Sequence, residues 1–103
     1  MPWQSGHYYI FSKFLIRAVV PAQMSGVFGL YTCQERVFIG ESANLRSALL
    51  RLHSDMIRFG FDRPTGFTFE LCVPALRRKR LRQLLVEHEV AYNDQRANII
   101  LYG

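Results

Sequence analysis

A chain of 103 residues has the usual size of one domain, and with half of its residues apolar it is too hydrophobic for a disordered protein. Thirteen Lys and Arg against eight Asp and Glu give a net charge of +5, which favours a phosphate-bearing or acidic partner. No apolar run approaches the roughly 20 residues that span a bilayer, and the N-terminus lacks the basic-then-apolar order of a signal peptide. We therefore expect a soluble, cytoplasmic protein that does not bind membranes.

The first element in the chain is a short predicted helix. Its end is marked by Pro21, because proline disfavours helical backbone in the residue before it. The apolar residues that recur at helical spacing are Phe11, Phe14, Leu15 and Ala18.

Two β-prone segments follow, over residues 27–32 and 36–40, and a polar turn around Gln34 joins them. This pattern predicts an antiparallel hairpin. Phe28 lies on its first arm and Phe38 on its second.

A helical stripe then replaces the strand pattern, with Ser42 or Asn44 placed to cap its start. Residues 60–66 read as a loop, and residues 67–73 alternate as a third strand that Pro74 closes. The apolar stripe of this helix consists of Leu45, Ala48, Leu49, Leu52 and Met56.

A longer helix is predicted over residues 75–91, and residues 98–102 are either a short terminal strand or a packed tail. One face of this helix carries Leu81, Leu84, Leu85 and His88.

The cysteines and histidines do not have the spacing of a metal site. Cys33 and Cys72 form no CxxC pair and have no histidine pair at zinc-ligand spacing, so we interpret both as buried free thiols. On its apolar stripe, His88 is interpreted as a hydrogen-bonded core residue, and His53 as a solvated one.

The stretch SGVFGLYTCQERVFIGESANLRSALLRLH resembles the core of the GIY-YIG endonuclease superfamily. The resemblance covers residues 20–93 and implies an α+β fold in which helices flank a small three-stranded antiparallel sheet. On this basis residues 1–103 form a single domain, with residues 1–20 as an N-terminal extension and residues 94–103 as a C-terminal tail.

The resemblance also implies where catalytic residues would lie. The two family tyrosines correspond to Phe28 and Phe38, and the family arginine, ten residues after the second tyrosine, corresponds to Ala48. None of these side chains carries a heteroatom that could activate water or stabilise a phosphate. We therefore expect them to pack in the core and the chain to have lost the chemistry.

Two alignments compete for the family's metal-binding glutamate and its asparagine. The first, which we prefer because it is gapless, gives Leu81 and Asn93. The second gives Glu87 and Asn98. Under the first alignment no metal ligand remains and no cofactor is expected, whereas under the second Glu87 would hold Mg²⁺ or Mn²⁺.

An active endonuclease therefore remains an alternative, with displaced residues doing the catalytic work. Such an enzyme would be a metal-dependent phosphodiesterase. The candidate displaced residues are Tyr31, Glu41, Arg51, His53 and Glu87.

Our leading hypothesis is instead a catalytically degenerate domain that binds DNA or RNA through phosphate contacts from arginines. A run of five cations within six residues would concentrate positive potential near one helix start, although a solvated face that confers solubility would also explain it. The candidate nucleic-acid-binding residues are Arg46, Arg51, Arg77, Arg78, Lys79, Arg80 and Arg82.

A further alternative is a protein-interaction module, either a subunit of a larger assembly or a homo-oligomer. Clustered aromatic side chains are enriched at protein interfaces. The aromatic residues proposed for this surface are Trp3, Tyr8, Tyr9 and Phe11.

Overall fold

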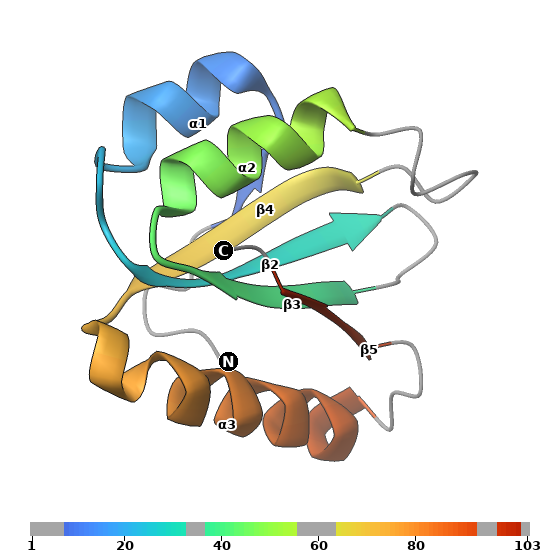
Figure 1. Ribbon diagram of the computed structural model, residues 1–103. Coiled ribbons are helices and arrows are strands. Elements are labelled where there is room, and N and C mark those ends of the chain that lie inside the picture. Colours follow the sequence, from blue (N-terminus) through green and yellow to red (C-terminus); the bar gives the residue numbers. More distant parts are fainter. Residues whose placement is uncertain (1–7, 33–36, 56–63, 93–96, 102–103) are drawn as a thin grey trace.

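The computed structural model describes residues 8–32, 37–55, 64–92 and 97–101, and Figure 1 shows their arrangement. In chain order the elements are β1 (Tyr9–Ile10), α1 (Lys13–Val19), β2 (Gly26–Thr32), β3 (Val37–Ser42), α2 (Leu45–Ser54), β4 (Pro64–Leu71), α3 (Pro74–Tyr92) and β5 (Ala97–Leu101).

All the strands belong to one sheet, in the order β1-β4-β2-β3-β5. The pairs β1–β4, β4–β2 and β2–β3 are antiparallel, whereas β5 runs parallel to β3. The predicted α+β class and the β2–β3 hairpin are confirmed. The predicted number of three strands is wrong, because β1 and β5 add one strand at each edge of the sheet.

The helices cover both faces of the sheet. Figure 1 shows α1 and α2 on one face and α3 on the other. Strand register assigns residues to these faces, since directly paired residues point the same way. Phe28 on the central strand β2 is paired with Gly40 and Phe69, and the neighbouring Val27 is paired with Glu41 and Glu70.

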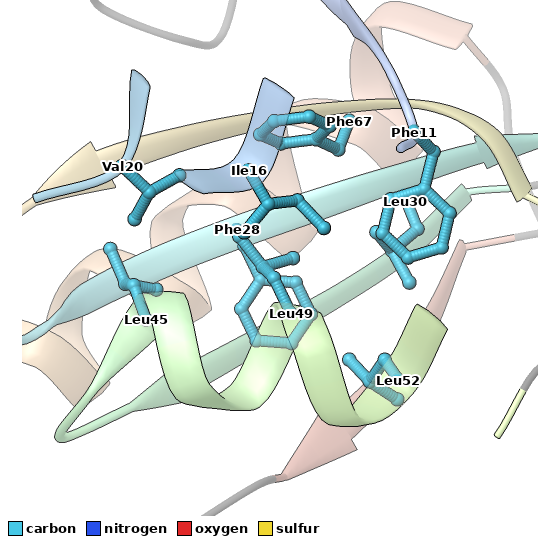
Figure 2. Packing of buried hydrophobic residues seen from close by; sticks show 9 residues of the cluster. All are labelled: Phe11, Ile16, Val20, Phe28, Leu30, Leu45, Leu49, Leu52 and Phe67. Atoms are coloured by element: carbon cyan, nitrogen blue, oxygen red, sulfur yellow. The ribbon is translucent and has the colours of Figure 1, made fainter. Parts of the chain in front are cut away.

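The face under α1 and α2 carries the larger apolar cluster (Figure 2). Its stripe on α2 follows the prediction, up to Met56, which lies outside the described residues. The stripe predicted for α1 is partly right, because Phe11 and Leu15 contact this cluster. The helix itself starts at Lys13 and buries Ile16, while Phe14 stays 78% exposed. The buried members of this cluster are Phe11, Ile16, Val20, Phe28, Leu30, Leu45, Leu49, Leu52 and Phe67.

The face under α3 has a smaller apolar cluster. Its buried members are Val27, Ile39, Leu81 and Leu84. Tyr31, Cys72 and Leu85 pack against them. None of the described helices is both long and apolar enough to span a bilayer.

Polar side chains fix the starts of the two shorter helices. The Ser12 hydroxyl accepts from Leu15 N at 3.1 Å, and the Asn44 side chain accepts from Ser47 N at 3.2 Å. Asn44 is therefore the cap of α2. Ser42, the other candidate, ends β3 and hydrogen-bonds to the backbone of Asn44.

Gly26 lies where β2 closely approaches both β4 and α2. A Cβ added there would lie 2.1 Å from the backbone oxygen of Glu70 and 2.7 Å from Leu45 Cδ1. Only a residue without a side chain allows β2, β4 and α2 to meet at this point.

Candidate functional site

Three of the family-equivalent positions lie on the face covered by α1 and α2. Phe28 is fully buried there, and Phe38 is half-buried and packs against the same cluster. Ala48 is buried on the α2 stripe. The side chains at these three positions contain no polar atom.

The positions assigned to α3 lie on the opposite face. Leu81 belongs to the smaller cluster, and Glu87 forms a 3.6 Å ion pair with Arg80 Nη1. The sheet therefore lies between Phe28 and Ala48 on one side and the α3 residue of either alignment, Leu81 or Glu87, on the other. Asn98 is the register partner of Phe38 on β5, and Asn93 lies outside the described residues.

The displaced catalytic set is also divided by the sheet. Tyr31, Glu41 and Glu87 are on the α3 side, whereas Arg51 and His53 belong to α2. His53 is half-buried against the Phe11 ring, with 5.1 Å between ring centroids, and so is not fully solvated. Burial lowers its pKa, with a smaller contribution from Lys13.

The most developed polar structure lies between the sheet and α3. Two glutamates, Glu41 on β3 and Glu70 on β4, flank Val27 and are only 7% and 6% exposed. A buried carboxylate needs charged or hydrogen-bonding partners. Both glutamates are contacted by arginines of α3, but the geometry of the contacts differs.

Glu70 is fully engaged by Arg80. The arginine donates from Nε to Oε2 and from Nη2 to Oε1, each at 2.7 Å, which is the two-point geometry of a strong pair. The hydrogen bonds to Glu70 raise the pKa of Arg80 above its ordinary value. Arg80 also contacts Gln83 and Glu87 through Nη1.

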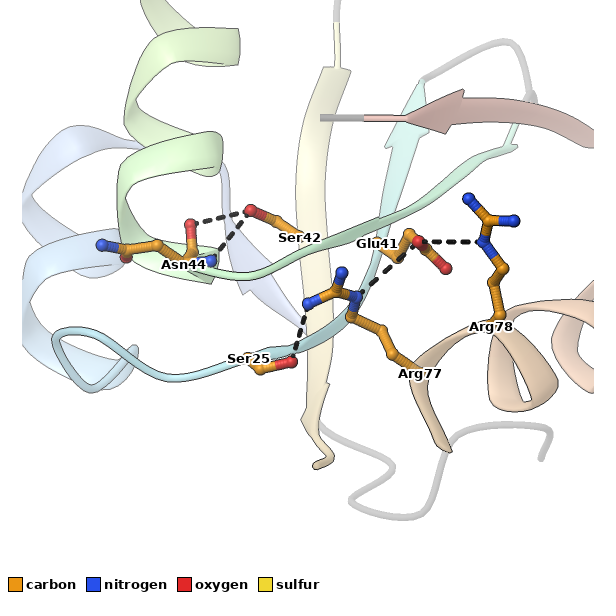
Figure 3. Close-up of polar contacts among 6 residues, drawn as sticks. All are labelled: Ser25, Glu41, Ser42, Asn44, Arg77 and Arg78. Atoms are coloured by element: carbon orange, nitrogen blue, oxygen red, sulfur yellow. Dashed lines mark hydrogen bonds and ion pairs between the residues drawn. The ribbon is translucent and has the colours of Figure 1, made fainter. Parts of the chain in front are cut away.

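Glu41 is held more loosely, by the contacts with Arg77 and Arg78 that Figure 3 shows. Its Oε1 lies 3.7 Å from Arg77 Nε and 3.7 Å from Arg78 Nε, beyond hydrogen-bond distance. Arg77 Nη1 donates instead to the Ser25 hydroxyl at 3.1 Å. Glu41 Oε2 and Arg77 Nε are buried without a hydrogen-bond partner among the described residues.

Three cations of the run remain on the outer side of α3, where Arg78 has a side chain 75% exposed and Lys79 and Arg82 are exposed. Lys79 and Arg82 line an open hollow of about 560 Å³ together with Gln83, Val86 and Glu87. Arg77 and Arg80 are thus turned inward to glutamates, whereas Lys79 and Arg82 are turned outward. Arg78 does both, because its side chain is exposed and also approaches Glu41.

The candidate arginines of α2 do not join this surface. Arg46 donates from Nε to Val20 O at 2.7 Å and from Nη2 to Arg17 O at 3.2 Å, and so satisfies carbonyls at the end of α1. Arg51 is exposed and belongs to α2, which covers the other face of the sheet from α3 (Figure 1).

The proposed aromatic interaction surface is mostly internal. Phe11 is buried in the larger cluster, and the Tyr9 ring lies 5.4 Å from that of Phe67. Tyr8 is 44% exposed and packs edge-on against Tyr31. Trp3 lies outside the described residues.

Cys72 is a half-buried free thiol beside Leu81 and Leu84, and burial raises its pKa, followed by the influence of Glu70. Cys33 lies outside the described residues. No group of three or more His, Cys, Asp or Glu side chains able to hold a metal ion occurs in the part of the chain that is described.

Comparison with known proteins gives no match: no family model, no curated protein and no solved structure is significantly similar to this chain.

The buried glutamates are the main feature that sequence reasoning missed. In residues 67–73, Thr68 and Glu70 alternate with apolar residues and look like the solvent face of a strand. The signal that could have revealed their burial is the arginine run that follows, because a helix rich in arginine can cover a face that carries carboxylates.

Proposed function

We propose that this domain binds nucleic acid through phosphate contacts from α3 and does not cleave it. The observation that carries the proposal is the division of the cation run. Arg77 and Arg80 are turned inward to Glu41 and Glu70, whereas Arg78, Lys79 and Arg82 keep exposed side chains, although Arg78 also approaches Glu41.

The outward cations suit phosphate and give little access to base edges. Arg78, Lys79 and Arg82 are exposed on one helix, and Lys79 and Arg82 border the same hollow. Contacts of this kind position a protein on the backbone without selecting a sequence. We therefore expect weak, non-specific binding with strong salt dependence.

We propose that the domain does not cleave nucleic acid because of the side chains at the positions that the resemblance assigns to catalysis. Phe28, Phe38 and Ala48 offer no proton acceptor, donor or metal ligand. In addition, Glu87 is across the sheet from all three and is already paired with Arg80. A scaffold of this type can keep a binding surface after its catalytic residues are replaced.

Fluorescence anisotropy with labelled duplex DNA and single-stranded RNA tests the proposal. Three phosphate contacts predict a slope of log affinity against log salt of about −2.7 for duplex and about −2.1 for single strands. The test variant replaces Arg78, Lys79 and Arg82 with Gln. The matched control removes the same charge from Lys13, Arg17 and Arg51 on α1 and α2.

The α3 variant should lose at least about tenfold in affinity at low salt, which is about 1.4 kcal/mol, while the control variant keeps most of it. Failure of the wild-type protein to bind at low ionic strength would remove the proposal, as would equal losses in both variants. Cleavage of either nucleic acid with Mg²⁺ or Mn²⁺ would contradict the non-catalytic part.

A second candidate function is protein association, favoured by two exposed apolar side chains. Ile10 on β1 is 72% exposed and Phe14 on α1 is 78% exposed. Strand register places Ile10 on the α3 side of the sheet, whereas Phe14 lies on α1 on the other side, so each side chain is a separate candidate for burial against a partner. Light scattering over a range of concentrations should then show self-association that Phe14→Glu abolishes. A monomer at every concentration excludes the homo-oligomer.

A further inference from the structure

The two buried glutamates have opposite balances of charge around them. At Glu41, two guanidinium groups face one carboxylate, which leaves one positive charge uncompensated. At Arg80, one guanidinium faces the two carboxylates of Glu70 and Glu87. An anion is therefore attracted to the first group and repelled by the second.

The hydrogen bonds also leave Arg77 and Arg78 more available to an anion than Arg80. Arg80 uses Nε and Nη2 on Glu70 at 2.7 Å, so its best donors are occupied. The ion pairs of Glu41 with Arg77 and Arg78 are longer, at 3.7 Å from Oε1 to Nε in both cases. Arg77 Nε is buried without a hydrogen-bond partner among the described residues, and the side chain of Arg78 is 75% exposed.

From these observations we propose that Ser25, Arg77 and Arg78 form a phosphate-binding corner in which Glu41 acts as an internal counterion that a phosphate group displaces. The inference rests on the proposed nucleic-acid binding and names the residues that regulate its strength. Two arginine forks and a hydroxyl supply the donors that a tetrahedral oxyanion needs.

The position of the corner on α3 supports the same ligand. Arg77 and Arg78 lie in the first turns of a helix that begins at Pro74, where the backbone dipole adds positive potential. Glu41 is buried on its strand, so a phosphate reaches the corner from the exposed side of Arg78. Without phosphate, Glu41 keeps Arg77 in place. When phosphate binds, the negative charge of Glu41 lowers the affinity of the corner for it.

Nuclear magnetic resonance of the arginine Nε–Hε groups, assigned with Arg→Lys variants, tests the proposal. Inorganic phosphate is titrated into the full chain at constant ionic strength. The resonances of Arg77 and Arg78 should shift with saturation, while that of Arg80 stays in place. A shift of Arg80 equal to theirs, or no saturable shift of Arg77, overturns the proposal.

Two variants then test the counterion. Glu41→Gln should tighten phosphate binding by about tenfold, because it removes a like charge from the site. Asp55→Asn removes an equal charge at the end of α2, on the opposite side of the sheet, and should leave phosphate binding within about twofold. Unchanged or weaker binding in Glu41→Gln would show that Glu41 does not compete.

Should Glu41→Gln fail to fold, Arg78→Gln gives an independent answer. Arg78 is exposed, so its loss leaves the sheet intact, and it should abolish the phosphate shift at Arg77. A shift at Arg77 that persists in Arg78→Gln would mean that the two arginines do not share a phosphate.

The phosphate group could come from a nucleic-acid backbone or from a free phosphate or monoester. To distinguish these two sources, the titration is repeated with a dinucleoside monophosphate, which carries only a phosphodiester, and its affinity is compared with that of inorganic phosphate. A preference for the diester indicates a nucleic-acid backbone, and a preference for inorganic phosphate indicates a free phosphate or monoester. Nucleic-acid binding without shifts at Arg77 and Arg78 would overturn this inference and leave the proposed function standing. Phosphate-induced shifts of Arg77 and Arg78 without any nucleic-acid binding would overturn the proposed function and leave the phosphate-binding corner standing.

Discussion

Glu70 on β4 and Arg80 on α3 are joined at both ends, with each carboxylate oxygen accepting one guanidinium N–H at 2.7 Å. Such a pair fixes direction as well as distance, because both groups are planar. The pair therefore helps to orient the 19-residue helix α3 on the sheet, together with the apolar contacts of Leu81 and Leu84. On this face the apolar cluster is small, and the ionic pair supplements it.

Replacing one partner of this pair should strongly destabilise the fold. Glu70→Gln leaves Arg80 largely buried with less compensation, and we expect a loss of about 3 kcal/mol in the free energy of unfolding. Urea denaturation measures this loss. Arg82→Gln, an exposed neighbour on the same helix, should change the free energy by less than about 0.5 kcal/mol. A loss below about 1 kcal/mol in Glu70→Gln would show that the pair contributes little.

A tyrosine at position 28 should destabilise the protein. Phe28 is fully buried in the larger apolar cluster, so the hydroxyl of Phe28→Tyr lacks water, and we expect a cost of about 1–3 kcal/mol. Phe38→Tyr is the matched control, because Phe38 is half-buried and its new hydroxyl can reach solvent. Thermal unfolding of both variants makes the comparison, and equal stabilities would contradict it.

Gly26 should not tolerate a side chain. In Gly26→Ala the new Cβ would lie 2.1 Å from the Glu70 carbonyl oxygen, and a backbone atom cannot rotate away. Overpacking of this kind costs about 1–3 kcal/mol, measured as a lower urea midpoint. Gly66→Ala is the control, since its Cβ would meet only Tyr9 O at 3.4 Å. A midpoint for Gly26→Ala that matches the wild type would rule out this close contact.

His53 should make stability depend on pH. Its folded pKa is lowered by burial and by Lys13, whereas the unfolded chain has the ordinary value of 6.5. Between the lowered pKa and 6.5 the unfolded chain binds more protons, so stability falls as pH decreases through this window. His53→Gln should reduce the difference in melting temperature between neutral and mildly acidic solution. The same difference in wild type and variant would refute this role.

Local patterns predicted the central elements well. The hairpin and the second helix are encoded by short-range alternation and helical spacing, and Asn44 was one of two caps that spacing allowed. The edge strands were harder to predict. A two-residue strand such as β1 has no period of its own, and β5 is defined by pairing with β3. Tertiary contacts therefore decided both edges.

The candidate site was predicted only in part. Sequence reasoning found the cation run on α3 but could not divide it, since the direction of each side chain depends on where the helix meets the sheet. Glu41 appeared only as one of several displaced catalytic candidates, and Glu70 was not considered. Alternation separates the two faces of a strand, but it cannot tell whether a helix covers the second one.

The sheet of this protein is held differently on its two faces, by apolar packing under α1 and α2 and by a small apolar cluster with arginine–glutamate contacts under α3. Guanidinium ions can take the place of an arginine on a carboxylate, whereas urea is uncharged. The layer made by α3 is thus the part most sensitive to the choice of denaturant. Guanidinium chloride should release this helix before the hairpin and its covering helices melt, and urea should unfold both layers together.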